Sequence, residues 1–263
     1  MTTVGDGGDA VTSPAAQAAA PMLSFRSLVK KRGSFALGPV DVEFNVGVSA
    51  LLGANGSGKT TFMQLAAGLI APDSGSIEHS SRAENRTVSA AGFLPQDFSG
   101  PRRPRVRDYL RFIAWCRSGG GLRIRESDID DALSAVDLAD RADSRIGTLS
   151  GGMVKRLGIA QALLGDPGVI ILDEPTVGLD PLQRQEIRIL LQRLGEQKTV
   201  LVSTHLSEDV AATAKNVVAL HGGHVVFSGS TRALAGDDAP GRPGAEAVER
   251  GLIALIEGRA AHA

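Results

Sequence analysis

The sequence predicts an α/β fold, in which a mostly parallel sheet is accompanied by a small antiparallel β layer and an inserted helical subdomain. Three observations lead to this fold class. An apolar strand at residues 48–52 passes through a glycine-rich stretch into a helix that begins near Lys59. Residues 169–172 are apolar without interruption, which is typical of a strand buried on both faces of a parallel sheet. Between these two strands, residues 97–148 have the periodicity of helices.

The composition is that of a folded protein with one large or two modest domains. In 263 residues the hydrophobic fraction is 43% and the formal net charge is -1, which gives no overall electrostatic reason to expect nucleic acid as a partner. Cys116 is the only cysteine, so no internal disulfide can form and a reducing, cytoplasmic location is favoured. Because Cys116 follows Trp115 in an apolar stretch, we expect a small core residue there. No apolar run approaches the ~18 residues of a membrane-spanning helix.

The chain begins with a segment that we do not expect to fold. Residues 1–21 are rich in Ala, Gly, Thr and Ser and lack the basic start and apolar core of a secretory signal, so we expect a disordered tail. Residues 22–44 alternate in short runs broken by Gly33 and Gly38-Pro39, which predicts two or three antiparallel strands. We expect a main domain at 22–230 with the helical subdomain at about 97–148, followed by a linker and C-terminal helix at 231–263.

The remaining elements follow from periodicity and from the residues that interrupt it. A strand at 91–95 ends at Pro95 and leaves Gln96 at the sheet edge. Ser127 opens an amphipathic helix, and Ser207 is expected to cap a helix that runs to about Ala214. The other predicted elements are helices at 59–71 (with Leu69 on the apolar face), 107–115, 152–164, 181–194 and 247–260, strands at 76–78 and 199–204, and a hairpin at 217–227 around Gly222-Gly223.

His221 and His224 flank the hairpin turn and could suggest a metal site. We interpret them as cross-strand neighbours, because no third or fourth ligand lies nearby in the sequence.

The stretch that begins at Gly53 has the P-loop pattern G-x-x-x-x-G-K-(S/T) between a strand and a helix. Its glycines let the backbone turn N–H groups inward, which makes a nest for phosphate oxygens at a helix N-terminus. A glycine-rich turn without a ligand is the alternative, and the four matching positions in this context favour the phosphate site. Lys59 is expected to reach the β- and γ-phosphates, and the Thr60 hydroxyl to bind Mg²⁺. The predicted nucleotide-binding residues here are Gly53, Asn55, Gly56, Ser57, Gly58, Lys59, Thr60 and Thr61.

Two carboxylates follow the apolar strand at 169–172. Because parallel strands deliver their C-terminal ends to one edge of the sheet, we expect Asp173 and Glu174 to lie near the P-loop. Asp173 is expected to hold Mg²⁺, and Glu174 to orient and deprotonate the water that attacks the γ-phosphate. An acidic pair that caps the next helix is the alternative interpretation.

Further motifs make the chain resemble the ABC-type ATPases. The sequence Leu-Ser-Gly-Gly-Met at 149–153 is similar to the signature motif of that family. Gln96 resembles the Q-loop glutamine, Gly-Leu-Asp at 178–180 the D-loop, and His205 the switch histidine. The motifs occur in the order of the family and lie within about residues 22–230. The resemblance implies ATP and Mg²⁺ as cofactors, with two ATP molecules held between two head-to-tail subunits.

The resemblance also implies a role for each of these residues. Ser150, Gly151 and Gly152 would complete the partner's nucleotide site, together with Asp180 of the D-loop. His205 would contact the γ-phosphate and sense hydrolysis, and Gln96 would touch Mg²⁺ or the attacking water. From the residues alone, Ser150 reads as a helix cap and His205 as a histidine at a strand end.

One position departs from the family pattern. Where an aromatic residue usually stacks on adenine, this chain has Arg32, and Phe35 is the other candidate. A guanidinium can stack on a base through its planar face, so we expect Arg32 to fill this role.

The family offers transport or a soluble mechanical task. The interval 97–148 is too short for the long coiled coil of repair ATPases, and there is no second P-loop, so an ATPase subunit of a transporter is favoured. It would form a homodimer or heterodimer, sit at the inner face of the membrane through a separate permease chain, and have no nucleic-acid partner. The motifs at 149–180, the stretch at 203–209 and the C-terminal helix resemble those of ATPase subunits of bacterial exporters, which favours export. An importer subunit, or an ATP-sensing protein with little hydrolysis, is the alternative. An arginine cluster that could meet the permease or anionic lipid consists of Arg102, Arg103, Arg105, Arg107 and Arg111.

Overall fold

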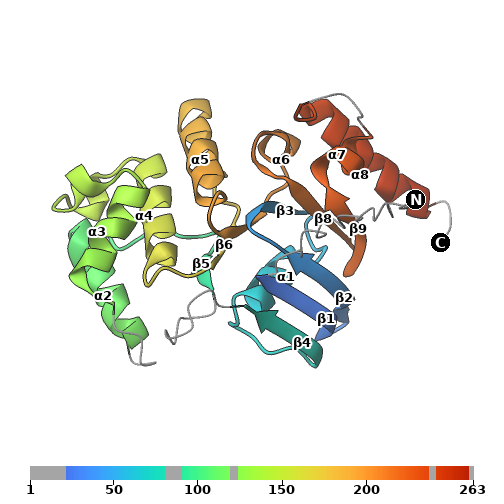
Figure 1. Ribbon diagram of the computed structural model, residues 1–263, viewed down its shortest axis with the longest axis horizontal. Helices are drawn as coiled ribbons and strands as arrows, with labels where there is room; N and C mark the ends of the chain where they lie inside the picture. The colour runs from blue at the N-terminus through green and yellow to red at the C-terminus, as the bar shows by residue number, and fades with distance from the viewer. Residues whose placement is uncertain (1–21, 81–90, 119–123, 237–240, 261–263) are drawn as a thin grey trace, which may run out of the picture.

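The computed structural model describes residues 22–80, 91–118, 124–236 and 241–260, so the tail expected at 1–21 lies outside the described residues (Figure 1). Its main sheet has the strand order β5-β6-β7-β3-β8-β9, in which the first five strands are parallel and β9 is antiparallel at one edge. This confirms the α/β fold predicted from the sequence. The strands are β3 (Gly47–Gly53), β5 (Gly92–Leu94), β6 (Val169–Asp173), β7 (Thr199–Ser203), β8 (Asn216–His221) and β9 (His224–Ser230).

A separate three-stranded antiparallel sheet has the order β2-β1-β4. Its strands are β1 (Leu23–Arg32), β2 (Phe35–Phe44) and β4 (Ser74–His79). The helix α1 (Lys59–Ala66) lies between this sheet and the main one, and its Phe62 ring stacks at 4.6 Å from Phe25. Phe44 meets both rings edge to face, at centroid distances of 6.0 and 6.2 Å. These aromatic contacts fix α1 against the small antiparallel sheet.

The strand β6 shows why an uninterrupted apolar run predicts a central parallel strand. Val169 and Ile171 face the core that contains α1, whereas Ile170 and Leu172 face a second core on the opposite side of the sheet. The second core is built with α4 (Gly151–Leu163), α5 (Pro181–Leu194) and α6 (Ser207–Thr213). Both faces of the strand are therefore buried, and its C-terminal end is delivered to the phosphate edge.

The interval 97–148 contains helices α2 (Val106–Ser118) and α3 (Glu126–Ala135) and the short 3-10 helices η1 (Ala139–Arg141) and η2 (Ile146–Thr148). They lie beside α4 at the far left of Figure 1, away from the small antiparallel sheet. Leu110, Ile129 and Leu133 are buried and join the second core. At the other end of the molecule, α8 (Ala245–Ala260) packs against α6 and against α7 (Thr231–Ala235). Among the described residues, no helix is both long and apolar enough to cross a membrane.

Several local predictions are wrong for geometric reasons. Cys116 is exposed and Trp115 is 73% exposed, because the buried positions of α2 are Leu110 and Ala114 and the next two residues turn away from them. The helix α1 ends at Ala66 and leaves Leu69 at 58% exposed.

Two predicted helix starts are also displaced, and one short helix was not predicted. Ser207 is the first residue of α6 instead of its cap, and the capping position is Leu206. The helix α3 begins at Glu126 instead of Ser127. The helix α7 falls where a linker was expected. The hairpin is confirmed, and His221 and His224 are cross-strand partners as predicted.

Candidate nucleotide site

The phosphate loop joins β3 to α1 and depends on glycine at two positions. Gly56 and Gly58 have φ of 81° and 106°, in the left-handed region that side chains disfavour. A Cβ on Gly58 would also lie 2.9 Å from Cζ of Phe35, so the space as well as the dihedral requires glycine. Gly58 is the N-cap of α1, which places the first backbone N–H groups of the helix at the loop. Such an arrangement fits an anion.

Lys59 lies inside the loop and is 8% exposed. Its Nζ donates hydrogen bonds to the carbonyl oxygens of Gly53 at 2.7 Å and Ala54 at 3.2 Å. Burial lowers the pKa of Lys59, while the charges of Glu174 and Asp173 act in the opposite direction. The ammonium is therefore held at the loop by neutral acceptors, which leaves its charge to act on an anion in the nest.

The carboxylate of Asp173 lies at the C-terminal end of β6 and is 3% exposed. It accepts a hydrogen bond from Oγ of Ser203, at the end of the neighbouring strand β7. Burial raises the pKa of Asp173, and the charge of Glu174 adds to this, whereas Ser203 and Lys59 oppose it. The side chain is an oxygen ligand in a site that lacks enough positive charge for it, which is the situation that a bound Mg²⁺ would relieve.

Glu174 adopts a backbone conformation that is unusual for a residue with a side chain. Its φ is 48°, and its N–H is directed to Oγ of Ser203 at 2.9 Å. The carboxylate Oε1 lies 3.3 Å from Nδ1 of His205, whose side chain is 50% exposed. Strained conformations of this kind persist only where the surrounding structure imposes them, and they concentrate at functional sites.

Lys59, Asp173 and Glu174 line one cavity of about 420 Å³ at the C-terminal edge of the parallel sheet. Gln96, just after β5, also lines this cavity. The cavity combines inward amides, a lysine, a threonine hydroxyl and carboxylates, which is the donor set that a triphosphate with Mg²⁺ needs. Gly53, Ser57 and His205 are not among its lining residues, and Oγ of Ser57 is buried with no hydrogen-bond partner among the described residues. The cavity is lined by Phe35, Asn55, Gly56, Gly58, Lys59, Thr60, Thr61, Gln96, Asp173 and Glu174.

Arg32 is not among the residues that line this cavity. Its Nη2 donates to Oε1 of Gln64 at 2.8 Å, whereas the ring of Phe35 reaches the loop beside Gly58. Of the two candidates for contact with a base, the structure brings Phe35 to the cavity.

The signature residues and the D-loop aspartate also lie apart from the cavity. Oγ of Ser150 accepts the N–H of Met153 at 3.3 Å and caps α4. Asp180 caps α5 by accepting the N–H of Gln183 at 2.8 Å. A Cβ on Gly152 would lie 3.0 Å from Cγ of Gln183, so the two helix starts are adjacent. They form a second polar site on the same chain.

Two residues that contact the site were not predicted from the sequence. Ser203 bridges Asp173 and Glu174, and Lys155 of α4 donates to the carbonyl oxygen of Gln96 at 3.0 Å. Burial lowers the pKa of Lys155, against the charges of Asp97, Glu174 and Asp173. A serine at the end of the strand next to β6 was the available signal for Ser203. The contact of Lys155 depends on how α4 packs against β5, which no local pattern encodes.

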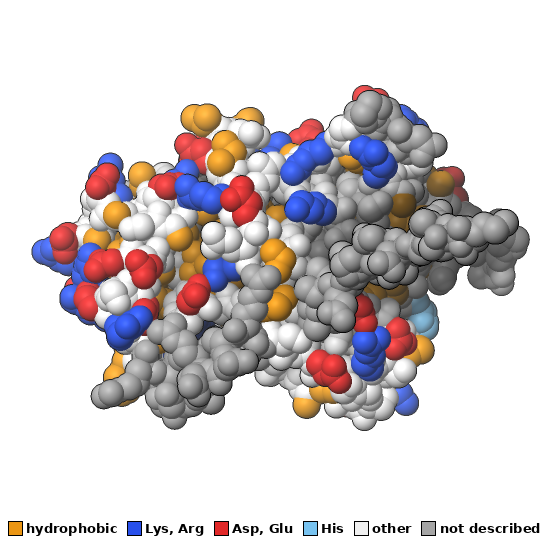
Figure 2. All heavy atoms as spheres, in the orientation of Figure 1, with side chains coloured by type: hydrophobic (Ala, Val, Ile, Leu, Met, Phe, Trp, Pro, Cys, Tyr) orange, Lys and Arg blue, Asp and Glu red, His pale blue; other side chains and the backbone are white. Residues whose placement is uncertain are grey.

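The predicted arginine cluster is largely neutralised within the molecule. Nη1 of Arg107 lies 2.6 Å from Asp130 and 2.9 Å from Glu126, and Arg111 also pairs with Glu126. These carboxylates raise the pKa of both arginines. Figure 2 shows the resulting mixture of blue and red side chains over the left end of the molecule. Arg102 and Arg103 are exposed, as are Arg105 and Arg111, which have carboxylate partners.

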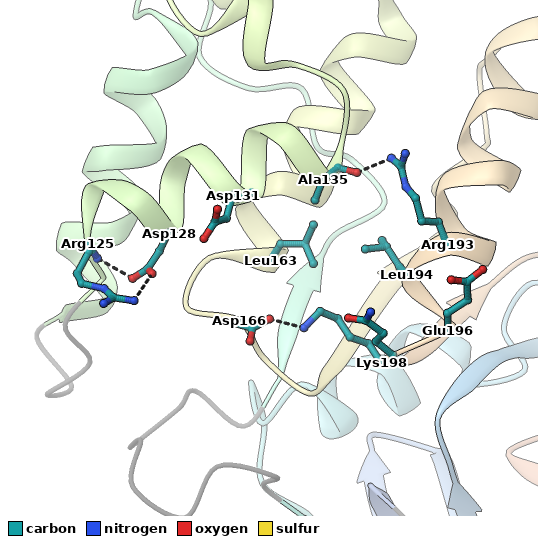
Figure 3. A pocket seen from close by; sticks show the side chains of 12 residues that line it. Arg125, Asp128, Asp131, Ala135, Leu163, Asp166, Arg193, Leu194, Glu196 and Lys198 are labelled. Carbon is teal, nitrogen blue, oxygen red and sulfur yellow. Dashed lines mark hydrogen bonds and ion pairs between the residues drawn. The ribbon is translucent and has the colours of Figure 1, made fainter.

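A second hollow of about 540 Å³ lies between α3 and the C-terminal ends of α4 and α5 (Figure 3). Its cations already have acceptors: Arg125 bonds to Asp128, Lys198 to Asp166, and Arg193 to the carbonyl oxygen of Ala135. It includes none of the phosphate-loop residues, so the phosphate site is the smaller cavity.

The sequence of this chain is similar to a known protein family and to individual proteins. Residues 38–177 match the profile of a protein family described as "ABC transporter". The chain is 38% identical over 217 residues to the uncharacterized ABC transporter ATP-binding protein YxlF of Bacillus subtilis, covering 81% of this chain and 72% of that protein. It is 34% identical to the Nod factor export ATP-binding protein I of Burkholderia orbicola, with the same two coverages, 81% and 72%.

A further relative is longer than this chain. The probable multidrug ABC transporter ATP-binding protein YbhF of Escherichia coli is 34% identical, and the match covers 76% of this chain but 35% of YbhF. Among solved structures, cbiO1 from Clostridium perfringens, described as part of the ABC transporter complex cbiONQ, aligns with a TM-score of 0.71 at 26% identity. That alignment covers 92% of this chain and 98% of the other.

Proposed function

Because the chain belongs to the ABC transporter ATP-binding family, we propose that it hydrolyses ATP with Mg²⁺ and drives a separate membrane permease. The observation that carries this proposal is the grouping of Lys59, Asp173 and Glu174 in one cavity with the amides of the phosphate loop. An ATP-binding site needs the loop and lysine, whereas hydrolysis also needs a carboxylate to accept a proton from water. Glu174, held 3.3 Å from His205, is in the place for that role.

In this proposal, residues of the cavity and the neighbouring His205 have different roles in binding and hydrolysing ATP. The loop amides and Lys59 bind the phosphates, and Thr60, Asp173 and Gln96 would hold Mg²⁺. Bound Mg²⁺ would neutralise charge on the phosphate oxygens. Glu174 orients and deprotonates the attacking water, and His205 contacts the γ-phosphate and responds to its loss. Phe35 is the better candidate for stacking on the base.

The second polar site supports a head-to-tail dimer. Ser150, Gly151 and Gly152 begin α4 and lie beside the start of α5 at Asp180, but none of the four lines the cavity. In the proposed dimer, of two identical or two related chains, these residues close over the ATP bound by the partner subunit. One chain then supplies a different half of each of two sites.

We place the protein at the cytoplasmic face of a membrane, bound through its permease, and favour export. Two relatives carry names that refer to multidrug transport and Nod factor export, which supports this direction. An adjacent gene for a multi-span membrane protein would support the assignment, and an adjacent gene for a solute-binding protein would favour import.

Hydrolysis is tested by Glu174→Gln. We expect turnover to fall by about 10²- to 10⁴-fold, because the general base is lost, while ATP affinity is retained. Steady-state phosphate release and equilibrium binding measure the two quantities. Glu43→Gln, in an exposed ion pair with Arg26, is the control and should leave both unchanged. If the wild type binds ATP but releases no phosphate, the protein is an ATP sensor and the hydrolytic role is wrong.

A further inference from the structure

A buried carboxylate outside the cavity joins the two segments that carry Glu174 and His205. Asp209 of α6 is 4% exposed. Its Oδ2 accepts a hydrogen bond from Oγ1 of Thr176 at 2.5 Å, and its Oδ1 accepts one from Nε of Arg188 at 2.7 Å. A carboxylate this deeply buried is stable only with such partners, so the three side chains form one linked group.

Thr176 connects this group to the backbone of Glu174. The carbonyl oxygen of Glu174 accepts the N–H of Val177, and that of Thr176 accepts the N–H of Leu179, each at 3.4 Å. Two overlapping turns therefore run from Glu174 to the residue before Asp180. Thr176 is 1% exposed, and its hydroxyl is the side-chain contact that fixes these turns to α6.

Asp209 is connected on its other side to His205. Its N–H donates to the carbonyl oxygen of Leu206 at 3.1 Å, in the turn that follows His205 and opens α6. The histidine side chain is half exposed and has Glu174 as its side-chain partner. The relative position of His205 and Glu174 is thus set largely by what holds their two backbone segments together.

We propose that Asp209, through Thr176, is a positioning residue that holds Glu174 in its left-handed conformation against His205 and so governs ATP turnover more than ATP affinity. The phosphate loop joins β3 to α1, whereas the carboxylate of Asp209 is bonded to Thr176 and Arg188, which belong to neither element. The inference rests on the proposed hydrolytic function. It assigns no direct contact with ATP to Asp209, Thr176 or Arg188.

The sharpest test uses Thr176, because Asp209→Asn would also remove the buried partner of Arg188 and leave that guanidinium only the exposed Glu208, which could destabilise the fold. Thr176→Val keeps the shape of the side chain and removes the hydroxyl, whereas Thr176→Ser keeps the hydroxyl and removes a methyl group. The two variants should be compared by kcat and KM for ATP and by hydrogen exchange of peptides covering 173–180 and 203–210.

We expect Thr176→Val to lower kcat by about ten- to a hundredfold with little change in KM, the loss expected from a small misplacement of catalytic groups. Exchange should quicken in both segments and stay unchanged in α1. Thr176→Ser should restore kcat and slow exchange. Equal kcat and equal exchange in the two variants would overturn the proposal, as would a valine effect confined to KM or to the melting temperature. Should the wild type lack hydrolysis, the proposed function fails by itself, and the exchange comparison still decides whether Asp209 holds the two segments together.

Discussion

We expect Phe35 to be the side chain that contacts the base of a bound nucleotide. Its ring lines the cavity and lies beside Gly58 of the phosphate loop, while Arg32 is engaged with Gln64. We expect Phe35→Ala to weaken ATP binding by roughly tenfold or more, since stacking on a base contributes about 1–3 kcal/mol. Arg32→Ala should change affinity little. Calorimetric titration with ATP measures both.

Tripolyphosphate separates stacking from damage to the loop, because it lacks a base. Its affinity should be equal in wild type and Phe35→Ala. A parallel loss for ATP and tripolyphosphate would mean that the ring supports the loop and does not contact the base.

We expect Asp173 to make the nucleotide-free protein less stable as the pH rises. Its pKa in the folded state is raised by burial above the ordinary value of 3.8. The stability that Asp173 contributes is therefore fully present at pH values below its ordinary pKa. This contribution is lost as the pH rises through the raised pKa of the folded state. We expect Asp173→Asn to raise the melting temperature of the free protein at neutral pH. The difference in melting temperature between the variant and the wild type should become smaller in acid.

Asp73→Asn is a control of opposite sign. The N–H of Lys31 and the ammonium of Lys30 lower the pKa of Asp73, so its contribution is present at neutral pH and is lost in acid. This substitution should lower the melting temperature at neutral pH. Equal shifts in the two variants would contradict the assignment for Asp173.

At the scale of single residues, the chemical type of the site is easier to predict from the sequence than the contacts of individual side chains are. Lys59, Asp173 and Glu174 were identifiable because a P-loop and a strand-end acidic pair have fixed places at the edge of a parallel sheet. Cys116 was misjudged because its environment depends on which way a helix face turns, and the bond of Arg32 to Gln64 depends in the same way on how a strand end is directed. Asp209 was not identified, because its partners come from separate elements.

Among the elements, β5 and α4 are packed without room for a side chain. A Cβ on Gly92 would lie 1.9 Å from the carbonyl oxygen of Ala162, so Gly92→Ala must push the strand and the helix apart. We expect a loss of about 1–3 kcal/mol in the free energy of unfolding, as is usual for overpacking. Urea denaturation measures it.

Gly244→Ala is the matched control, because a Cβ there meets no atom within 4 Å. It should leave stability unchanged within about 0.5 kcal/mol. A Gly92→Ala variant as stable as this control would show that the contact between β5 and α4 is looser than described.

Elements with a strong local signal were predictable, and short ones were not. The helix α5 begins and ends as expected because Asp180 caps it and Pro181 occupies its first position. The strand β6 was recognisable from its apolar run. The five residues of α7 are too few for a periodic pattern, and this helix depends on packing against α8.

At the scale of the whole molecule, we expect the permease to dock near Arg102 and Arg103, for which the described residues show no ion pair. Arg102 and Arg103 are exposed, whereas Arg107 is held by Asp130 and Glu126. We expect the double substitution Arg102→Glu and Arg103→Glu to weaken recovery of the protein with membranes that contain its permease, because rim charges steer association. Cosedimentation at low and high salt measures this, and ATP affinity should be unchanged.

Arg107→Glu distinguishes docking from folding. It places like charges together within α2 and α3, so it should lower the melting temperature. If the double variant of Arg102 and Arg103 binds membranes as well as the wild type, these residues are a solvated surface and the docking site lies elsewhere.

The small antiparallel sheet is drawn from both sides of the phosphate loop. β1 and β2 precede the loop and β4 follows α1, yet β1 pairs with both strands. The chain therefore encloses its own phosphate helix, with Phe62 packed against Phe25 and Phe44. In engineering terms, the nucleotide site cannot be transferred to another protein as one continuous segment. A graft of β3, the loop and α1 would leave the helix uncovered. A cut between β2 and β3 would separate β4 from β1, the strand it pairs with.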